Sequence, residues 1–119
     1  MGAAETSLEL LAEALAIMQH TEDRVWEAEI HRLQGMVLRQ AHPSHTAPAE
    51  AAVQQALAVA RRQQAKSLEL RAAVSLAHLW QQGKRTEAYA LLAPIYGWFT
   101  EGFDTTDLQE ASALLEELE

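Results

Sequence analysis

The chain has 119 residues and no cysteine, which allows one domain with a single core and excludes a disulfide framework, a thiolate zinc site and a thiol nucleophile. No basic leader opens the sequence and no apolar run approaches the ~20 residues of a membrane-spanning helix, so we expect a cytoplasmic protein without membrane contact. The net charge of −8 divides into −6 over residues 1–30, +5 over residues 31–99 and −7 over residues 100–119, which argues against general affinity for nucleic acid but leaves room for a local acidic partner.

Strong helix formers dominate the chain and alternating strand patterns are missing, so the sequence predicts an all-α fold of about six helices. The first helix is expected from Ser7 to His20, with Thr6 and Glu9 at the spacing of a capping box. The second is expected from Asp23 to Ala41. The third is expected from Pro48 to Gln64, because proline is favoured in the first turn of a helix.

The fourth helix, expected from Ser67 to Gln82, is apolar around most of its circumference and should be the most buried. Gly83 is expected to end it as a C-cap. The fifth begins near Arg85, and Pro94 is expected to kink or end it, since an interior proline loses a hydrogen bond. The last helix, from Thr106 to Leu118, has a narrow apolar face, which is typical of a terminal capping helix with one solvated side.

Small and apolar residues recur about every 40 positions, which is a sign of repeated helical hairpins. The matching groups are Leu11, Ala14 and Leu15, then Val53, Ala56 and Leu57, then Leu92 and Ile95. Their spacings are 42 and 39 residues, and small residues such as Gly35, Ala49 and Ala88 stand where helices would pack closely. This pattern resembles the tetratricopeptide repeat (TPR), although that repeat has about 34 residues.

Three segments, residues 26–35, 60–72 and 93–105, are similar to the C-terminal repeats of large bacterial signalling proteins. In those proteins a cyclase-like or regulator domain precedes an AAA-type ATPase and a helical-repeat tail. The resemblance implies that residues 1–119 form one TPR-like domain, a right-handed stack of antiparallel helical hairpins, at the C-terminal end of such a protein. It implies a non-catalytic protein-interaction module, or alternatively a domain for self-association or intramolecular docking.

Motifs of the common enzyme classes are missing from the sequence, including phosphate-binding loops, G-x-S-x-G and H-E-x-x-H, so we expect neither catalysis nor a cofactor. His42 and His45 flank a loop but lack further metal ligands, so we expect them to be solvated. Trp26 is in helical register with Ile30, which predicts a core position. Four other aromatic residues either form the seam with the last helix or line the end of a groove: Trp80, Tyr96, Trp98 and Phe99.

Polar residues form one stripe on each of the second and fourth expected helices, which would line the inner face of a TPR-like stack. Such a stripe faces either solvent or a ligand. The predicted partner-binding face comprises Glu29, Arg32, Met36, Arg39, Arg71, Ser75 and His78, and the stripe on the fourth helix continues to Gln82. Converging arginines favour carboxylates through charge-assisted bonds. The expected partner is a protein or peptide, an acidic one in particular, or another domain of the parent protein or a second copy.

Overall fold

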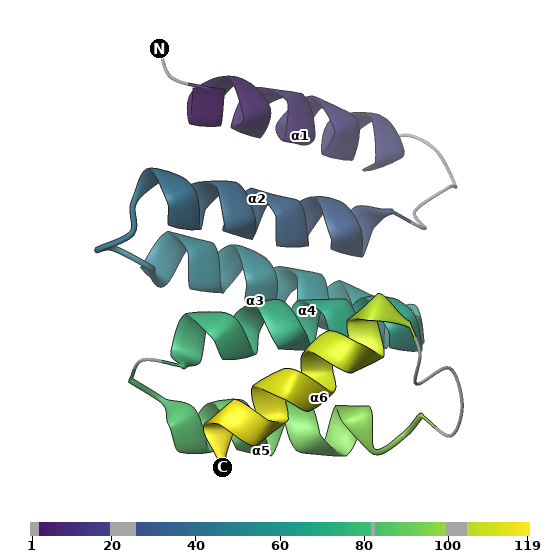
Figure 1. Cartoon of the computed structure of the whole chain (residues 1–119). Helices are drawn as coiled ribbons and strands as arrows, with labels where there is room; N and C mark the ends of the chain where they lie inside the picture. The colour runs from purple at the N-terminus through teal and green to yellow at the C-terminus, as the bar shows by residue number, and fades with distance from the viewer. Residues whose placement is uncertain (1–2, 20–25, 82, 100–104) are drawn as a thin grey trace.

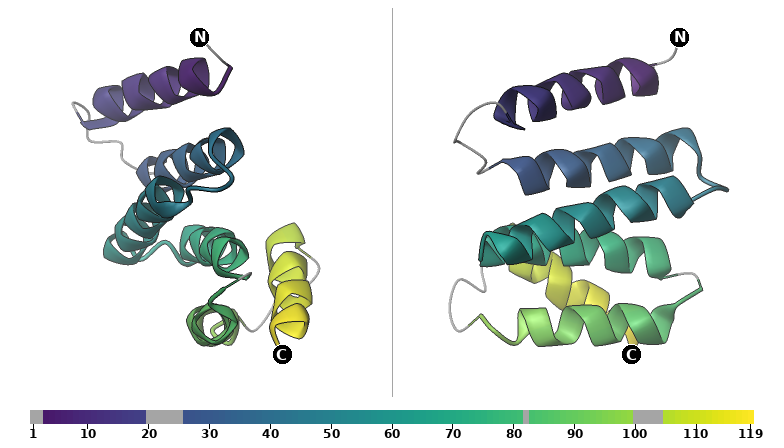
Figure 2. Two further views of the ribbon diagram at one scale, coloured as in Figure 1. Left: turned by 90° about the vertical axis from the view of Figure 1, so that its left-hand side faces the viewer. Right: turned by 180° about the vertical axis from the view of Figure 1, so that it is seen from behind.

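The computed structural model describes residues 3–19, 26–81, 83–99 and 105–119. Within them the chain forms six helices and no strand, which confirms the all-α prediction. The helices are α1 (Ala3–Gln19), α2 (Glu27–Ala41), α3 (Ala47–Arg62), α4 (Lys66–Trp80), α5 (Arg85–Tyr96) and α6 (Thr106–Leu118). Successive helices α1 to α5 lie side by side like rungs, and α6 crosses obliquely over α4 and α5 (Figures 1 and 2).

The helices α2 and α3 pack closely along each other at Gly35. A methyl group added at Gly35 would collide with Cγ2 of Val53 and lie 3.0 Å from the carbonyl oxygen of Ala49. Both of these α3 residues are completely buried. Glycine at this position therefore lets the two backbones approach, which confirms its predicted role in close packing.

The core is centred on α4, which contacts α2, α3, α5 and α6. Leu70 and Leu76 of α4 are each 1% exposed, and Leu92 of α5 and Leu114 of α6 pack into the same cluster. Fully burying a side chain of this size stabilises a fold by roughly 1.5–3 kcal/mol. The expectation that the fourth helix is the most buried is confirmed for the described residues, because helices cover it on several sides.

Several predicted helix ends were wrong by a few residues. α1 begins at Ala3, so Thr6 lies inside the helix and cannot cap it, because the preceding residues are themselves good helix formers. α4 ends at Trp80, and the N–H groups of Gly83 and Lys84 both bond to the Trp80 carbonyl oxygen, at 3.2 and 2.7 Å. Gly83 therefore belongs to the turn that follows the helix and is not its C-cap.

Pro94 lies inside α5 and does not end the helix there. α5 continues through Pro94 to Tyr96, because this proline lies in the last turn and its ring is exposed. The predicted helix boundaries at His20, Asp23 and Gln82 lie outside the described residues.

The core position predicted for Trp26 was wrong, since 54% of this residue is exposed. Trp26 is the N-cap of α2, with φ −95° and ψ 3°, so it stands one residue before the regular helix and its side chain leaves the apolar stripe. None of the α1 residues whose exposure is described is buried, so α1 forms the least covered edge of the fold. Across the described parts of the chain, no helix combines the length and apolar character needed to cross a bilayer.

Candidate partner-binding site

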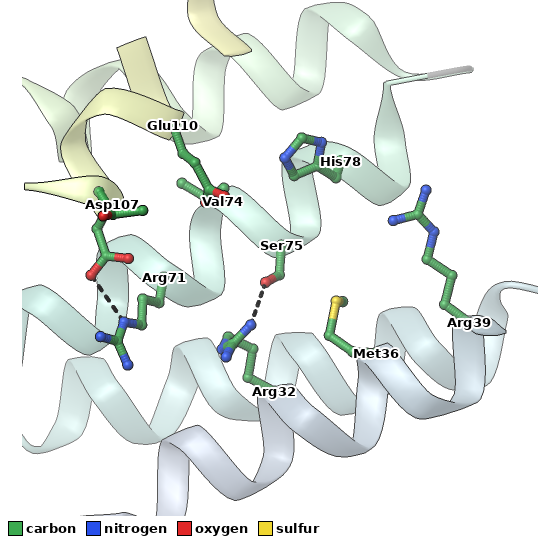
Figure 3. Close-up of a pocket in the computed structure, with 10 residues that line it drawn as sticks. Arg32, Met36, Arg39, Arg71, Val74, Ser75, His78, Asp107 and Glu110 are labelled. Atoms are coloured by element: carbon green, nitrogen blue, oxygen red, sulfur yellow. Dashed lines mark hydrogen bonds and ion pairs between the residues drawn. The ribbon is translucent and has the colours of Figure 1, made fainter. Parts of the chain in front are cut away.

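A cavity of about 350 Å³ lies where α2, α4 and α6 meet (Figure 3). Six of the seven residues predicted for the partner-binding face line it: Arg32, Met36, Arg39, Arg71, Ser75 and His78. The seventh, Glu29, binds two of these arginines from beside the cavity. We call this cavity the groove; its remaining lining residues are Val74, Thr106, Asp107 and Glu110.

The groove forms because two polar stripes face each other across packed helices. Arg32, Met36 and Arg39 are separated by four and three residues, which places them on one face of α2. The α4 residues Arg71 and Ser75 follow the same spacing, and α2 contacts α4. Gln82, which would extend the α4 stripe, lies outside the described residues.

An ion-pair network joins the three helices at one end of the groove. Arg71 donates from Nη1 to Oε2 of Glu29 at 2.6 Å and from Nε to Oδ2 of Asp107 at 2.9 Å. Arg32 donates from Nε to Oε1 of Glu29 and from Nη1 to the hydroxyl oxygen of Ser75, the latter at 3.4 Å. The network therefore links α2, α4 and α6 through side chains that are largely satisfied.

The titration behaviour of this network follows from its geometry. Burial by itself raises the pKa of Glu29, but the hydrogen bonds from Arg32 and Arg71, with their positive charges, outweigh burial and hold that pKa below its usual value. The pKa of Arg71 is raised by its hydrogen bonds to Asp107 and Glu29. Glu29 and Arg71 therefore face each other as a charged pair at neutral pH.

Two groups of the groove stand apart from this network. Among the described residues, Arg39 and His78 have no hydrogen-bond or ion-pair partner. Arg39 is exposed and His78 is half-buried. Of the three arginines expected to converge on a ligand, Arg32 and Arg71 are thus paired with carboxylates of the chain itself, and Arg39 is available.

The sequence did not reveal the acidic wall of the groove, which α6 supplies. Asp107 and Glu110 line the cavity from the side opposite α2 (Figure 3). Their spacing of three residues on an acidic helix was the only available signal, and it does not indicate which helix they face. The side of α6 that was expected to be solvated therefore lies partly over the groove.

The arginines at the end of α3, Arg61 and Arg62, lie outside the groove and pair with other carboxylates. Nε of Arg61 donates to Oε2 of Glu69 at 3.0 Å, and Nη2 of Arg62 lies 3.9 Å from Oε2 of Glu27. Both glutamates are buried and stand 42 residues apart, like the apolar repeat. These carboxylates join the end of α3 to α4 and α2, and no motif in the sequence marks them.

The four aromatic residues with two open interpretations differ in their surroundings. Tyr96 and Phe99 are partly buried against the core, whereas Trp98 is 46% exposed. Trp80 packs against the core and also lines a second cavity. His42 and His45 are exposed, and the described residues contain no group of three or more histidine and carboxylate side chains able to hold a metal ion.

Comparison of the chain with protein-family models, with curated proteins and with solved structures found no match. A proposal for the function therefore rests on the residues that line the groove and on their charges.

Proposed function

We propose that this chain is a non-catalytic, TPR-like interaction module whose groove binds a carboxylate-bearing segment of a partner protein. The observation that carries the proposal is the available Arg39 beside His78 in a cavity where the other arginines, Arg32 and Arg71, are engaged. A guanidinium in a partly enclosed site binds a carboxylate through short, often bidentate hydrogen bonds.

The order of helix contacts supports a TPR-like stack. α2 packs on α3 and α4 on α5 as two hairpins, and α6 contacts both helices of the second hairpin as a following helix would. The repeat spacing of 42 and 39 residues and the close approach at Gly35 fit the same architecture. In that arrangement α2, α4 and α6 would line one concave face, the place where such stacks bind extended segments.

A place at the C-terminal end of a bacterial multidomain signalling ATPase or cyclase-like protein in the cytoplasm is part of the proposal. It rests on the sequence resemblance of residues 26–35, 60–72 and 93–105. Binding is favoured over catalysis because arginine already engages the carboxylates of Glu29 and Asp107, so neither stands free to take a proton from a substrate.

A second candidate function is self-association or docking onto another domain of the same protein. The observation that favours it is the carboxylate of Asp107, which α6 already places on Arg71 in the groove. An acidic segment of a second copy could use the same chemistry at Arg39.

A random peptide display library selected on the purified domain tests the proposal. We expect the selected peptides to be enriched in aspartate and glutamate, and their binding to weaken about tenfold or more in Arg39→Ala, since a hydrogen-bonded charge contributes roughly 1.5–3 kcal/mol. The matched control is Arg85→Ala, because Arg85 is exposed and bonds only to the backbone carbonyl of Glu117 among the described residues. Equal losses in both variants, or no acidic enrichment, would overturn the proposal.

A further inference from the structure

The groove continues into a second cavity of about 360 Å³, and Arg39 and His78 line both cavities. The second cavity lies beyond the C-terminal half of α4. Its other lining residues are Pro43, Thr46, Glu50, Leu79, Trp80, Gly83 and Lys84. The available cation therefore stands at the border between two neighbouring cavities, where one bound segment can reach both.

The charges around this border favour a single carboxylate over a run of acidic groups. Lys84 of the second cavity already faces a carboxylate, with Nζ 3.6 Å from Oε1 of Glu50. On the opposite side, Asp107 and Glu110 line the groove and would repel further anions. Within the described residues, Arg39 is thus the unpaired cation of both cavities, which disfavours polyacidic segments and phosphate groups.

The second cavity offers carbon surface beside that cation. The indole N–H of Trp80 donates to Oε1 of Glu50 at 2.8 Å, so the polar edge of the ring is already satisfied. Nζ of Lys84 lies 5.3 Å from the centre of the ring, a cation–π contact that helps to fix the indole. Leu79 is half-buried and Pro43 is exposed at the same cavity. An apolar side chain placed here would remove carbon surface from water.

We infer that the recognised unit is one aspartate or glutamate with an aliphatic or aromatic residue beside it in the partner's sequence. The carboxylate pairs with Arg39, next to His78, and the apolar side chain enters the second cavity against Leu79 and Trp80. Each cavity lies near the lower end of the ~300–1,000 Å³ range of ligand pockets, which suits one or two side chains. The inference rests on the proposed function and specifies its partner.

Gly83 provides a way to fill the second cavity. A Cβ atom built at Gly83 meets nothing within 4 Å, and the residue is exposed in a turn. Gly83→Leu therefore adds carbon atoms at a residue that lines the cavity, with no obstacle to its Cβ, and leaves Arg39 unchanged. Substituting Trp80 or Leu79 would be less informative, because both also pack against the core.

The test uses capped synthetic peptides whose sequences follow those selected from the library, with acetylated and amidated ends so that the side chain is the only carboxylate. One peptide carries an acidic residue beside leucine, a second replaces the leucine by alanine, and a third replaces the acidic residue by its amide. Titration calorimetry should show about tenfold weaker binding for each replacement, since a well-placed apolar group contributes roughly 10-fold to 200-fold. Gly83→Leu should weaken the leucine peptide about tenfold and leave the alanine peptide unchanged.

The outcomes separate the inference from the proposed function. Acidic, Arg39-dependent peptides that show no apolar preference and bind Gly83→Leu normally would overturn the inference and leave the proposed function standing. An equal loss of both peptides in Gly83→Leu would also overturn it, because the loss would not come from filling the cavity. Peptides whose binding ignores Arg39→Ala would overturn both, as would a tight dimer of the domain that excludes every peptide.

Discussion

Leu76 and Trp26 are both large apolar residues at helical spacing, yet their surroundings differ. Leu76 is 1% exposed in the core around α4, whereas Trp26 is 54% exposed at the start of α2. Only the first has neighbouring atoms on all sides, so only its truncation leaves an enclosed cavity.

We expect Leu76→Ala to lower the free energy of unfolding by roughly 2–5 kcal/mol, since it removes buried carbon and leaves a void. Trp26→Ala should cost less than about 1 kcal/mol, because most of its surface is already in water. Urea denaturation followed by circular dichroism measures both. A Trp26→Ala loss as large as that of Leu76→Ala would contradict the exposed position of this tryptophan.

Gly35 gives a second test at the residue scale. Alanine is the better helix former by about 1 kcal/mol, but its methyl group would collide with Val53 and press on the Ala49 backbone. Overpacking of this kind costs about 1–3 kcal/mol, so we expect Gly35→Ala to destabilise the fold on balance.

The double variant Gly35→Ala, Val53→Ala should lose less stability than the sum of the two single losses, because removing the valine methyl groups relieves the main collision. Gly83→Ala is the control, because nothing lies within 4 Å of its added Cβ. Thermal melts that rank Gly35→Ala at or above the wild type would contradict the close packing of α2 on α3.

At the scale of helices, the sequence predicted element type better than element ends. The apolar face of α4 and the bounds of α6 were correct, because long periodic stripes specify helices strongly. Thr6 was assigned as a cap from its spacing to Glu9, yet α1 extends past it to Ala3, because capping signals compete with good helix formers upstream.

In the groove, the sequence likewise predicted the residues on each helix better than the contacts between helices. The stripes on α2 and α4 were visible in the sequence, because residues three and four apart share a helix face. The pairing of Arg71 with Asp107 was not visible in the sequence. It depends on the oblique path of α6 across α4 (Figure 1), which no local pattern encodes. Tertiary placement thus decides which arginine is left for a partner.

The network joining α2, α4 and α6 should make stability depend on pH. The pKa of Glu29 is lowered in the folded state, so its contribution is present above its unfolded value of 4.5 and is lost as pH falls below 4.5 and through the lower folded value. As the pH falls below 4.5, we expect the Glu29→Gln variant to lose less stability than the wild type does. Urea denaturation at several pH values measures this slope, and parallel profiles for the two proteins would contradict it.

At the scale of the whole molecule, the segregated charges of the sequence are partly brought together by folding. The acidic last segment returns to the basic middle, where Asp107 meets Arg71 and Glu117 accepts a hydrogen bond from Gln81 at 2.7 Å. The acidic residues of α1 remain on the edge of the fold, where Glu5, Glu9 and Glu13 are all exposed. The folded molecule therefore keeps an excess of negative charge at its surface.

This excess predicts how the domain associates with itself. With a net charge of −8 at pH 7, copies repel one another, so we expect a monomer of about 13.2 kDa by light scattering at low salt. Near the sequence pI of about 5.0 the repulsion vanishes while large apolar residues such as Leu10 and Trp98 stay exposed, so the apparent mass should rise as pH falls toward 5. A stable dimer at pH 7 that Arg39→Ala dissociates and Arg85→Ala does not would show instead that the groove binds a second copy, and would favour self-association as the function.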